Sequence, residues 1–117
     1  GNYYIDDLIL DTISQNSKAQ SKINPSFFKI DQNFPNPFNA YTIIKYQIPN
    51  KCYVTINVYN IIGKNIRTLV AKEQEPGYYV VSFDAKDNCG ITLSSGVYFY
   101  RICIPGYSYS NKMILIK

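Results

Sequence analysis

The sequence contains no histidine and no tryptophan, and it has only three cysteines among 117 residues. Without histidine, the chain has no Ser-His-Asp or Cys-His catalytic pair, no imidazole metal ligand and no imidazole pH switch. Cys52, Cys89 and Cys103 have no CxxC spacing, and their odd number argues against both a zinc site and a fully paired disulfide framework. A Gly-x-Ser-x-Gly nucleophile elbow is also missing. We therefore expect a protein that is not an enzyme and that needs no cofactor.

Long apolar runs and a strong charge of one sign are missing as well. No apolar run approaches the roughly 20 residues that a membrane-spanning helix needs, so we expect no transmembrane segment. The formal net charge is +4, and the basic residues are scattered singly along the chain. Such scattering is typical of a solvated surface rather than of a nucleic-acid-binding patch. We expect no nucleic-acid partner.

Tyrosine is abundant instead, with twelve tyrosines beside six phenylalanines. Tyrosine favours strands and combines an apolar ring with a polar hydroxyl, which suits sheets that are apolar inside and wet outside. Short segments rich in β-branched and aromatic residues are separated by turns of Pro, Gly and Asn, at residues 27–30, 41–48, 53–60, 65–71, 78–84, 96–102 and 110–117. With no helical period, this spacing predicts an all-β fold, an immunoglobulin-like antiparallel β-sandwich of about seven strands.

Alternation within these segments assigns side chains to two faces, because successive residues of a strand point to opposite sides. In residues 96–102, Tyr98, Tyr100 and Ile102 share one face, and Val97, Phe99 and Arg101 share the other. The same reasoning groups further sets on single faces: Thr42, Ile44, Tyr46 and Ile48; Val54, Ile56 and Val58; Tyr79, Val81 and Phe83. In residues 65–71 the apolar phase changes after Ile66, which predicts a β-bulge.

Composition divides the chain into three parts. Residues 1–10 are strand-like, and we interpret them as the tail strand of a preceding domain. Their adjacent Asp6 and Asp7 point to opposite faces of a strand, so they cannot act together on one substrate. Residues 11–26 have the composition of a polar linker. Residues 27–117 are expected to form the domain proper.

Two polar motifs stand between the strands. Asp84 and Asp87 lie in a stretch dense in turn formers and are weak candidates for a calcium site, without the ligand spacing of an EF-hand. Capping of the turn by their side chains is the favoured interpretation. The second motif is an Asn- and Pro-rich run that we expect to form a rigid surface loop anchored by its two phenylalanine rings, Asn33, Phe34, Pro35, Asn36, Pro37, Phe38 and Asn39.

Along residues 27–117, these runs together resemble the type A C-terminal sorting domain of the type IX (Por) secretion system. The resemblance rests on the loop motif above and on two runs near the end, Gly96, Val97, Tyr98, Phe99, Tyr100 and Arg101, then Lys112, Met113, Ile114, Leu115, Ile116 and Lys117. Departures occur at Ala40, Phe83 and Ala85, where that family often has Pro, Trp and Gly. The immunoglobulin-like domain of flagellar hook-capping proteins is related, and it matches the loop motif less well.

The resemblance implies a non-catalytic module that directs a cargo protein through the periplasm and across the outer membrane, so that the product is secreted or held at the cell surface. Its partners would be the outer-membrane translocon, a sortase-like peptidase and the cargo domain upstream in the same chain. The two runs near the C-terminus would be the sorting signal. The last strand, residues 110–117, would present an exposed edge that a partner reads by strand addition. We expect deletion of residues 111–117 to abolish export.

A different class of function stays open on the residues alone. The domain would then be a carbohydrate-binding or adhesive module attached to a secreted glycoside hydrolase. Its stacking platforms would be drawn from five tyrosines in or beside the expected strands, Tyr41, Tyr53, Tyr78, Tyr107 and Tyr109. Exposed tyrosines are common on β-sandwiches, so their spacing does not decide between the two functions.

Overall fold

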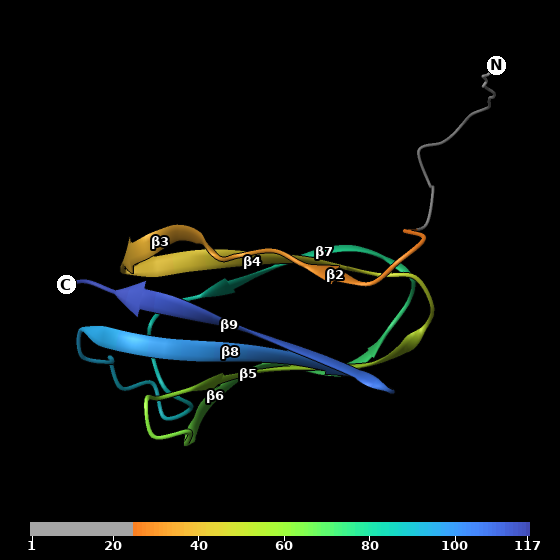
Figure 1. The fold of residues 1–117 in the computed structure, drawn as a ribbon. Helices are drawn as coiled ribbons and strands as arrows, with labels where there is room; N and C mark the ends of the chain where they lie inside the picture. The colour runs from red at the N-terminus through yellow and green to blue at the C-terminus, as the bar shows by residue number, and fades with distance from the viewer. Residues whose placement is uncertain (1–24) are drawn as a thin grey trace, which may run out of the picture.

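A computed structural model of the chain describes residues 25–117, which form eight strands and no helix. The strands are β2 (Lys29–Ile30), β3 (Phe34–Asn39), β4 (Tyr41–Ile48), β5 (Cys52–Tyr59), β6 (Asn65–Gln74), β7 (Gly77–Phe83), β8 (Gly96–Ile104) and β9 (Tyr107–Leu115). Two sheets pack face to face (Figure 1). The expected tail strand at 1–10, with Asp6 and Asp7, and most of the expected linker lie outside the described residues.

The first sheet is built around β4. It pairs antiparallel with β7 along its whole length, from Thr42 opposite Phe83 to Ile48 opposite Gly77. On its other side β4 pairs first with β2 and then with β3. The second sheet has the antiparallel order β6-β5-β8-β9. Because β2 and β3 share one strand position, the sheets have three and four strands, and the predicted immunoglobulin-like sandwich of about seven strands is confirmed.

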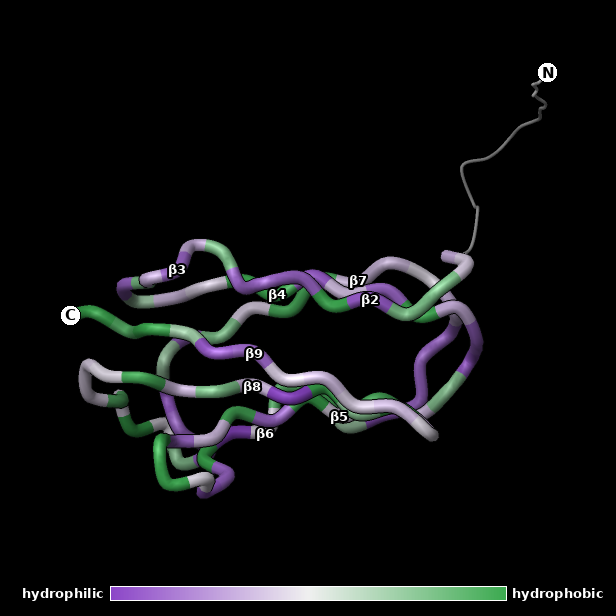
Figure 2. The backbone as a smooth tube through the Cα atoms, in the orientation of Figure 1, coloured by the Kyte–Doolittle hydropathy of each residue, from purple (hydrophilic) through white to green (hydrophobic). Residues whose placement is uncertain are grey.

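The core lies between the sheets, and sets of residues that are expected to share a face lie in it together. Thr42, Ile44 and Ile48 of β4 are fully buried, and Val54, Ile56 and Val58 of β5 lie opposite them at 0% exposure. Tyr98, Tyr100 and Ile102 are the buried face of β8. The end of β9, Met113–Leu115, is hydrophobic without a break (Figure 2).

The predicted bulge in β6 is confirmed. Pairing with β5 passes from Val70 opposite Ile56 to Thr68 opposite Asn57, so Leu69 has no partner in the register. A second shift leaves out Ile66. These extra residues turn the phase of the strand so that Val70 reaches the core at 8% exposure while Asn65, Thr68, Lys72 and Glu73 stay exposed.

Two buried tyrosines of β8 tie this strand to distant parts of the backbone. The Tyr98 hydroxyl donates to the Ser94 carbonyl four residues upstream, at 2.7 Å, which is the tyrosine corner of immunoglobulin-like sandwiches. The Tyr100 hydroxyl donates to the Asp31 carbonyl at 2.7 Å and accepts from the Asn33 backbone N–H at 2.9 Å. The segment between β2 and β3 is therefore fastened to the second sheet.

The loop motif differs from its prediction in two ways. It forms strand β3 rather than a surface loop, and only one of its rings anchors it. Phe38 is 2% exposed and packs against Phe83 with ring centroids 6.1 Å apart, whereas Phe34 is 74% exposed. The second anchor is Asn33, whose buried Nδ2 donates to Thr42 Oγ1 at 3.0 Å and to the Pro35 carbonyl at 3.1 Å. The hydrogen-bonded side-chain amide of Asn33 therefore anchors the motif in place of the Phe34 ring.

The first expected strand, 27–30, is also shorter than predicted. Only Lys29 and Ile30 pair with β4. Phe27 is exposed, and Phe28 packs edge-on against Tyr107 of β9 with centroids 4.9 Å apart. Phe28 thus reaches the second sheet, whereas the Phe27 carbonyl accepts a hydrogen bond from Gln47 Nε2 of β4 at 3.0 Å.

A candidate recognition face on the C-terminal strands

The two runs of the expected sorting signal lie side by side in the structure. The first belongs to β8 and the second to β9, joined by a turn in which Gly106 has a φ of +78°. In the antiparallel register Val97 is opposite Ile114, and Phe99 is opposite Lys112. Ile116 and Lys117 follow β9, and the Ile116 N–H donates to the Phe38 carbonyl at 2.9 Å.

Alternation divides these residues into a core half and an exposed half. The core half is Tyr98, Tyr100, Met113 and Leu115, all at most 7% exposed. The exposed half lies on the outer face of the second sheet and comprises the half-buried Val97, Phe99 and Ile114 and the exposed Arg101 and Lys112. We call these residues the outer face of β8 and β9. A protein that reads the folded domain can contact this second half, together with the exposed Ile116 and Lys117 that follow β9.

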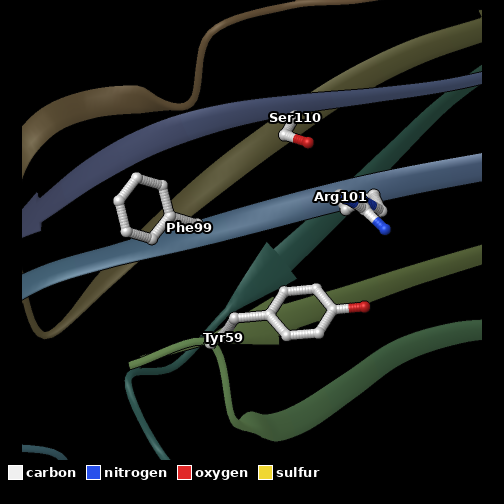
Figure 3. Close-up of a pocket in the computed structure, with 5 residues that line it drawn as sticks. Tyr59, Phe99, Arg101 and Ser110 are labelled. Carbon is white, nitrogen blue, oxygen red and sulfur yellow. The ribbon is translucent and has the colours of Figure 1, made fainter. Parts of the chain in front are cut away.

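A shallow cavity of about 310 Å³ lies on this face. Tyr59 of β5 and Phe99 stand directly opposite each other in the register, and Arg101 and Ser110 occupy the adjacent cross-strand pair. Figure 3 shows these four side chains on one side of the sheet. Sequence reasoning missed Tyr59 and Ser110, because strand pairing, which no single segment reveals, brings them beside Phe99 and Arg101.

The outer face carries positive charge beside apolar surface. Within residues 25–117, no carboxylate lies within ion-pair distance of Arg101 or Lys112, and the ion pairs there join Lys29 to Asp31, Lys51 to Glu75 and Arg67 to Asp84. A guanidinium free of a carboxylate can bind one in a bidentate manner, and the rings beside it can pack on apolar groups. The face therefore suits an apolar surface that carries a carboxylate.

The loop motif contacts the last strand and corrects one expectation. The Ile114 N–H donates to Asn36 Oδ1 at 2.9 Å, and Gln32 Nε2 donates to the Lys112 carbonyl at 2.9 Å. Phe38 pairs with Leu115 in parallel. The edge of the C-terminal half of β9 is thus covered rather than exposed, because the loop motif and the preceding Gln32 form hydrogen bonds with its backbone. The free edge lies earlier, at residues 107–111.

Asp84 and Asp87 serve the turn in which they lie. Asp84 Oδ1 accepts from Arg67 Nη1 at 2.7 Å, and this hydrogen bond lowers the pKa of the carboxyl. Asp87 Oδ1 accepts from the Cys89 and Ile91 N–H groups at 2.9 Å each, which is the capping that the sequence favoured. Among residues 25–117 no group of three His, Cys, Asp or Glu side chains is placed to hold a metal ion.

Two further sets of candidate residues are spread over the molecule. The tyrosines considered as stacking platforms are all exposed, but Tyr41 and Tyr78 belong to the first sheet, while Tyr53, Tyr107 and Tyr109 belong to two strands of the second. They do not converge on one surface. Cys52, Cys89 and Cys103 are all free thiols, and burial raises the pKa of the Cys52 thiol.

Comparison with known proteins places this architecture in a family. The family model described as "Secretion system C-terminal sorting domain" matches residues 32–117. The chain belongs to this family. No curated protein sequence matches it significantly. No helix within residues 25–117 is long and apolar enough to cross a membrane.

Two solved structures share the fold of this sorting domain. One is dimeric latent PorU from Porphyromonas gingivalis, with a TM-score of 0.62 and 19% identity over 81% of this chain and 10% of that chain. The other is PorZ, described as an essential bacterial surface component of the type-IX secretion system of Porphyromonas gingivalis, with a TM-score of 0.50 and 15% identity over 77% of this chain and 11% of that chain. The chain spans about a tenth of either protein, and the likeness concerns the fold.

Proposed function

We propose that this sorting domain directs a cargo protein, carried upstream in the same chain, across the outer membrane to the cell surface by the type IX system. The observation that carries the proposal is the gathering of the exposed half of the sorting signal on one face. Family membership supports a role as a secretion signal. The translocon would read the outer face of β8 and β9, and a sortase-like peptidase would act afterwards.

In the proposed mechanism the two halves of the signal have different roles, because one half stabilises the sandwich and the other contacts the partner. Tyr98, Tyr100, Met113 and Leu115 are buried and hold the sandwich together. Phe99, Arg101 and Lys112 stand in fixed register on the outer face, so their backbone can meet a partner without reorganising. A patch on a paired sheet loses little backbone entropy on binding, and the entropy cost falls on the Arg101 and Lys112 side chains. The partner surface would therefore be apolar and carry carboxylates.

Single substitutions on the outer face test the proposal. The full chain is fused behind a secreted reporter in a host with a type IX system, and surface display is measured by protease accessibility. Arg101→Glu and Phe99→Thr are expected to lower display roughly tenfold, because losing a central contact costs 1 kcal/mol or more. Lys45→Glu and Tyr78→Thr make the same kinds of change at exposed positions of the first sheet and are expected to leave display unchanged.

The stability of each purified variant is the necessary control. Equal display of Arg101→Glu and Lys45→Glu, with both domains folded, would rule out reading through this face. Deleting residues 111–117 does not separate loss of recognition from loss of folding. It removes Met113 and Leu115 from the core, at 0% and 1% exposure, so loss of export would follow from unfolding alone.

A further inference from the structure

The first half of β9 has an open backbone edge. The N–H groups of Ile114 and Ile116 and the carbonyl of Lys112 point away from β8, toward Asn36, Phe38 and Gln32. Backbone groups alternate in direction along a strand, and the β8 to β9 register is unbroken from Gly96 opposite Leu115 to Ile104 opposite Tyr107. The N–H and C=O groups of Ser108 and Ser110 therefore also point away from β8. Within residues 25–117 no strand pairs with them on that side.

This part of the edge carries none of the features that usually prevent strand pairing. Residues 107–111 contain no charged side chain and no proline, and their register has no bulge. The free edge of β6 differs, because it contains Arg67 and Lys72 and is broken by two register shifts. An edge left flat and neutral is suited to pairing with another strand.

A groove beside this edge completes the surface. It has a volume of about 270 Å³, lies between β2 and β9, and is lined by Phe28, Lys29, Ile30, Tyr107 and Tyr109. The two strands diverge here because β2 stays paired with β4 (Figure 1). β3 contacts β9 only from Ile114 onward and pairs with it at Leu115. Tyr107 and Tyr109 face the groove, whereas Ser108 and Ser110 face the outside of the sheet.

We propose that residues 107–111 bind an extended segment of a partner protein by strand addition. Ser108 and Ser110 supply four backbone hydrogen-bonding groups, and the segment continues the line that β3 begins along the same edge. Apolar side chains at alternate positions enter the aromatic groove, and small polar side chains lie beside the serines. The neutral edge selects a neutral segment without proline. This binding stands independently of the proposed sorting function.

A peptide probe tests this binding on the full 117-residue chain. The probe is an acetylated peptide of alternating Val and Thr with one C-terminal Lys, added to 15N-labelled protein. We expect amide hydrogen exchange at Ser108 and Ser110 to slow at least tenfold at saturation, as for amides that enter a sheet. Two control peptides are N-methylated at every Val or at every Thr, and at least one of them is expected to lose the effect, because each blocks one edge of the probe.

A matched pair of variants locates the contact. Ser108→Pro removes an N–H that points away from β8 and so leaves the ladder to β8 intact, and it is expected to weaken probe binding at least tenfold. Ser108→Ala keeps the N–H and is expected to bind like the wild-type chain. Unchanged exchange at Ser108 and Ser110 at millimolar probe, or equal affinity of the two variants with both folded, would overturn the proposal. Both of these results are independent of the reporter-export experiment, which tests Phe99 and Arg101.

Discussion

At the residue scale, the hydroxyl group of Tyr100 connects the two sheets. Tyr100 Oη donates to the Asp31 carbonyl and accepts from the Asn33 N–H and from Asn111 Nδ2, at 2.7, 2.9 and 3.1 Å. These partners belong to the crossover before β3 and to β9. All three lose their hydrogen bond together if the hydroxyl is removed.

Tyr100→Phe is therefore expected to lower the free energy of unfolding by about 1–3 kcal/mol, the usual cost of leaving buried polar groups unpaired. Urea denaturation measures this change. Tyr53→Phe is the matched control, because the Tyr53 side chain is 53% exposed and its hydroxyl is in water. Equal stability of the two variants would show that the Tyr100 hydroxyl does not fasten the crossover.

Burial also makes stability depend on alkaline pH. Burial raises the pKa of Tyr100 and of Tyr46, and the hydrogen bond that Tyr100 accepts from Asn111 partly opposes this rise for Tyr100. A raised folded-state pKa means that the protonated hydroxyl is favoured by folding, so the stability is fully present below the unfolded value near 10 and is lost as pH rises through the folded values. Unfolding free energies measured from about pH 9 to about pH 11 are expected to fall, and less steeply in Tyr100→Phe.

Backbone conformation explains one of the departures from the family pattern. Ala40 has a φ of +73° and is exposed, a conformation that costs an L-residue about 1 kcal/mol and that proline, fixed near −65°, cannot adopt. We expect Ala40→Gly to stabilise the domain by about 0.5–1 kcal/mol in thermal or urea unfolding, and Ala40→Pro to destabilise it. Ala85→Gly is the contrast. Its φ is +60°, but its methyl group is buried, so relieved strain is offset by lost packing.

At the scale of elements, the C-terminal half of β9 is a core strand held between β8 and β3. Met113→Ala is expected to lower the unfolding free energy by about 2–5 kcal/mol, the cost of emptying a buried site. Ile116→Ala, at a side chain 52% exposed, is expected to change it by no more than about 0.5 kcal/mol. Similar decreases of the unfolding free energy in Met113→Ala and Ile116→Ala, measured by urea unfolding, would contradict the assignment of Met113 to the core and of Ile116 to the surface.

The elements that could be predicted are those whose pattern is complete within one segment. In β4, β5, β7 and β8 the alternation of side chains is fixed within each segment, so the residues that share a face can be predicted from the sequence. Which of the two faces of β8 is buried depends on the other sheet. β3 could not be predicted, because its place between the sheets depends on contacts between distant residues. These are the hydrogen bond from Asn33 to Thr42 and the packing of Phe38 against Phe83. The cavity on the outer face could not be predicted for the same reason, because only the pairing of β5 with β8 places Tyr59 beside Phe99.

At the scale of the whole molecule, the proposed function treats the domain as a rigid carrier of one exposed pattern. Some residues of the expected signal are buried in the core, and others lie on the outer face of β8 and β9. Membership in the sorting-domain family supports a role as a secretion signal. PorU and PorZ share the fold of the domain. In the proposed function, folding and recognition depend on different side chains of the same two strands.

The most direct test compares two double variants of the reporter fusion that differ only in which sheet they alter. Phe99→Thr with Arg101→Glu changes the outer face of the second sheet, and Tyr78→Thr with Lys45→Glu makes matched changes on the first. With equal unfolding free energies for both purified domains, we predict that the first reporter accumulates in the periplasm and the second reaches the surface. Equal surface display of the two reporters would contradict recognition through the outer face.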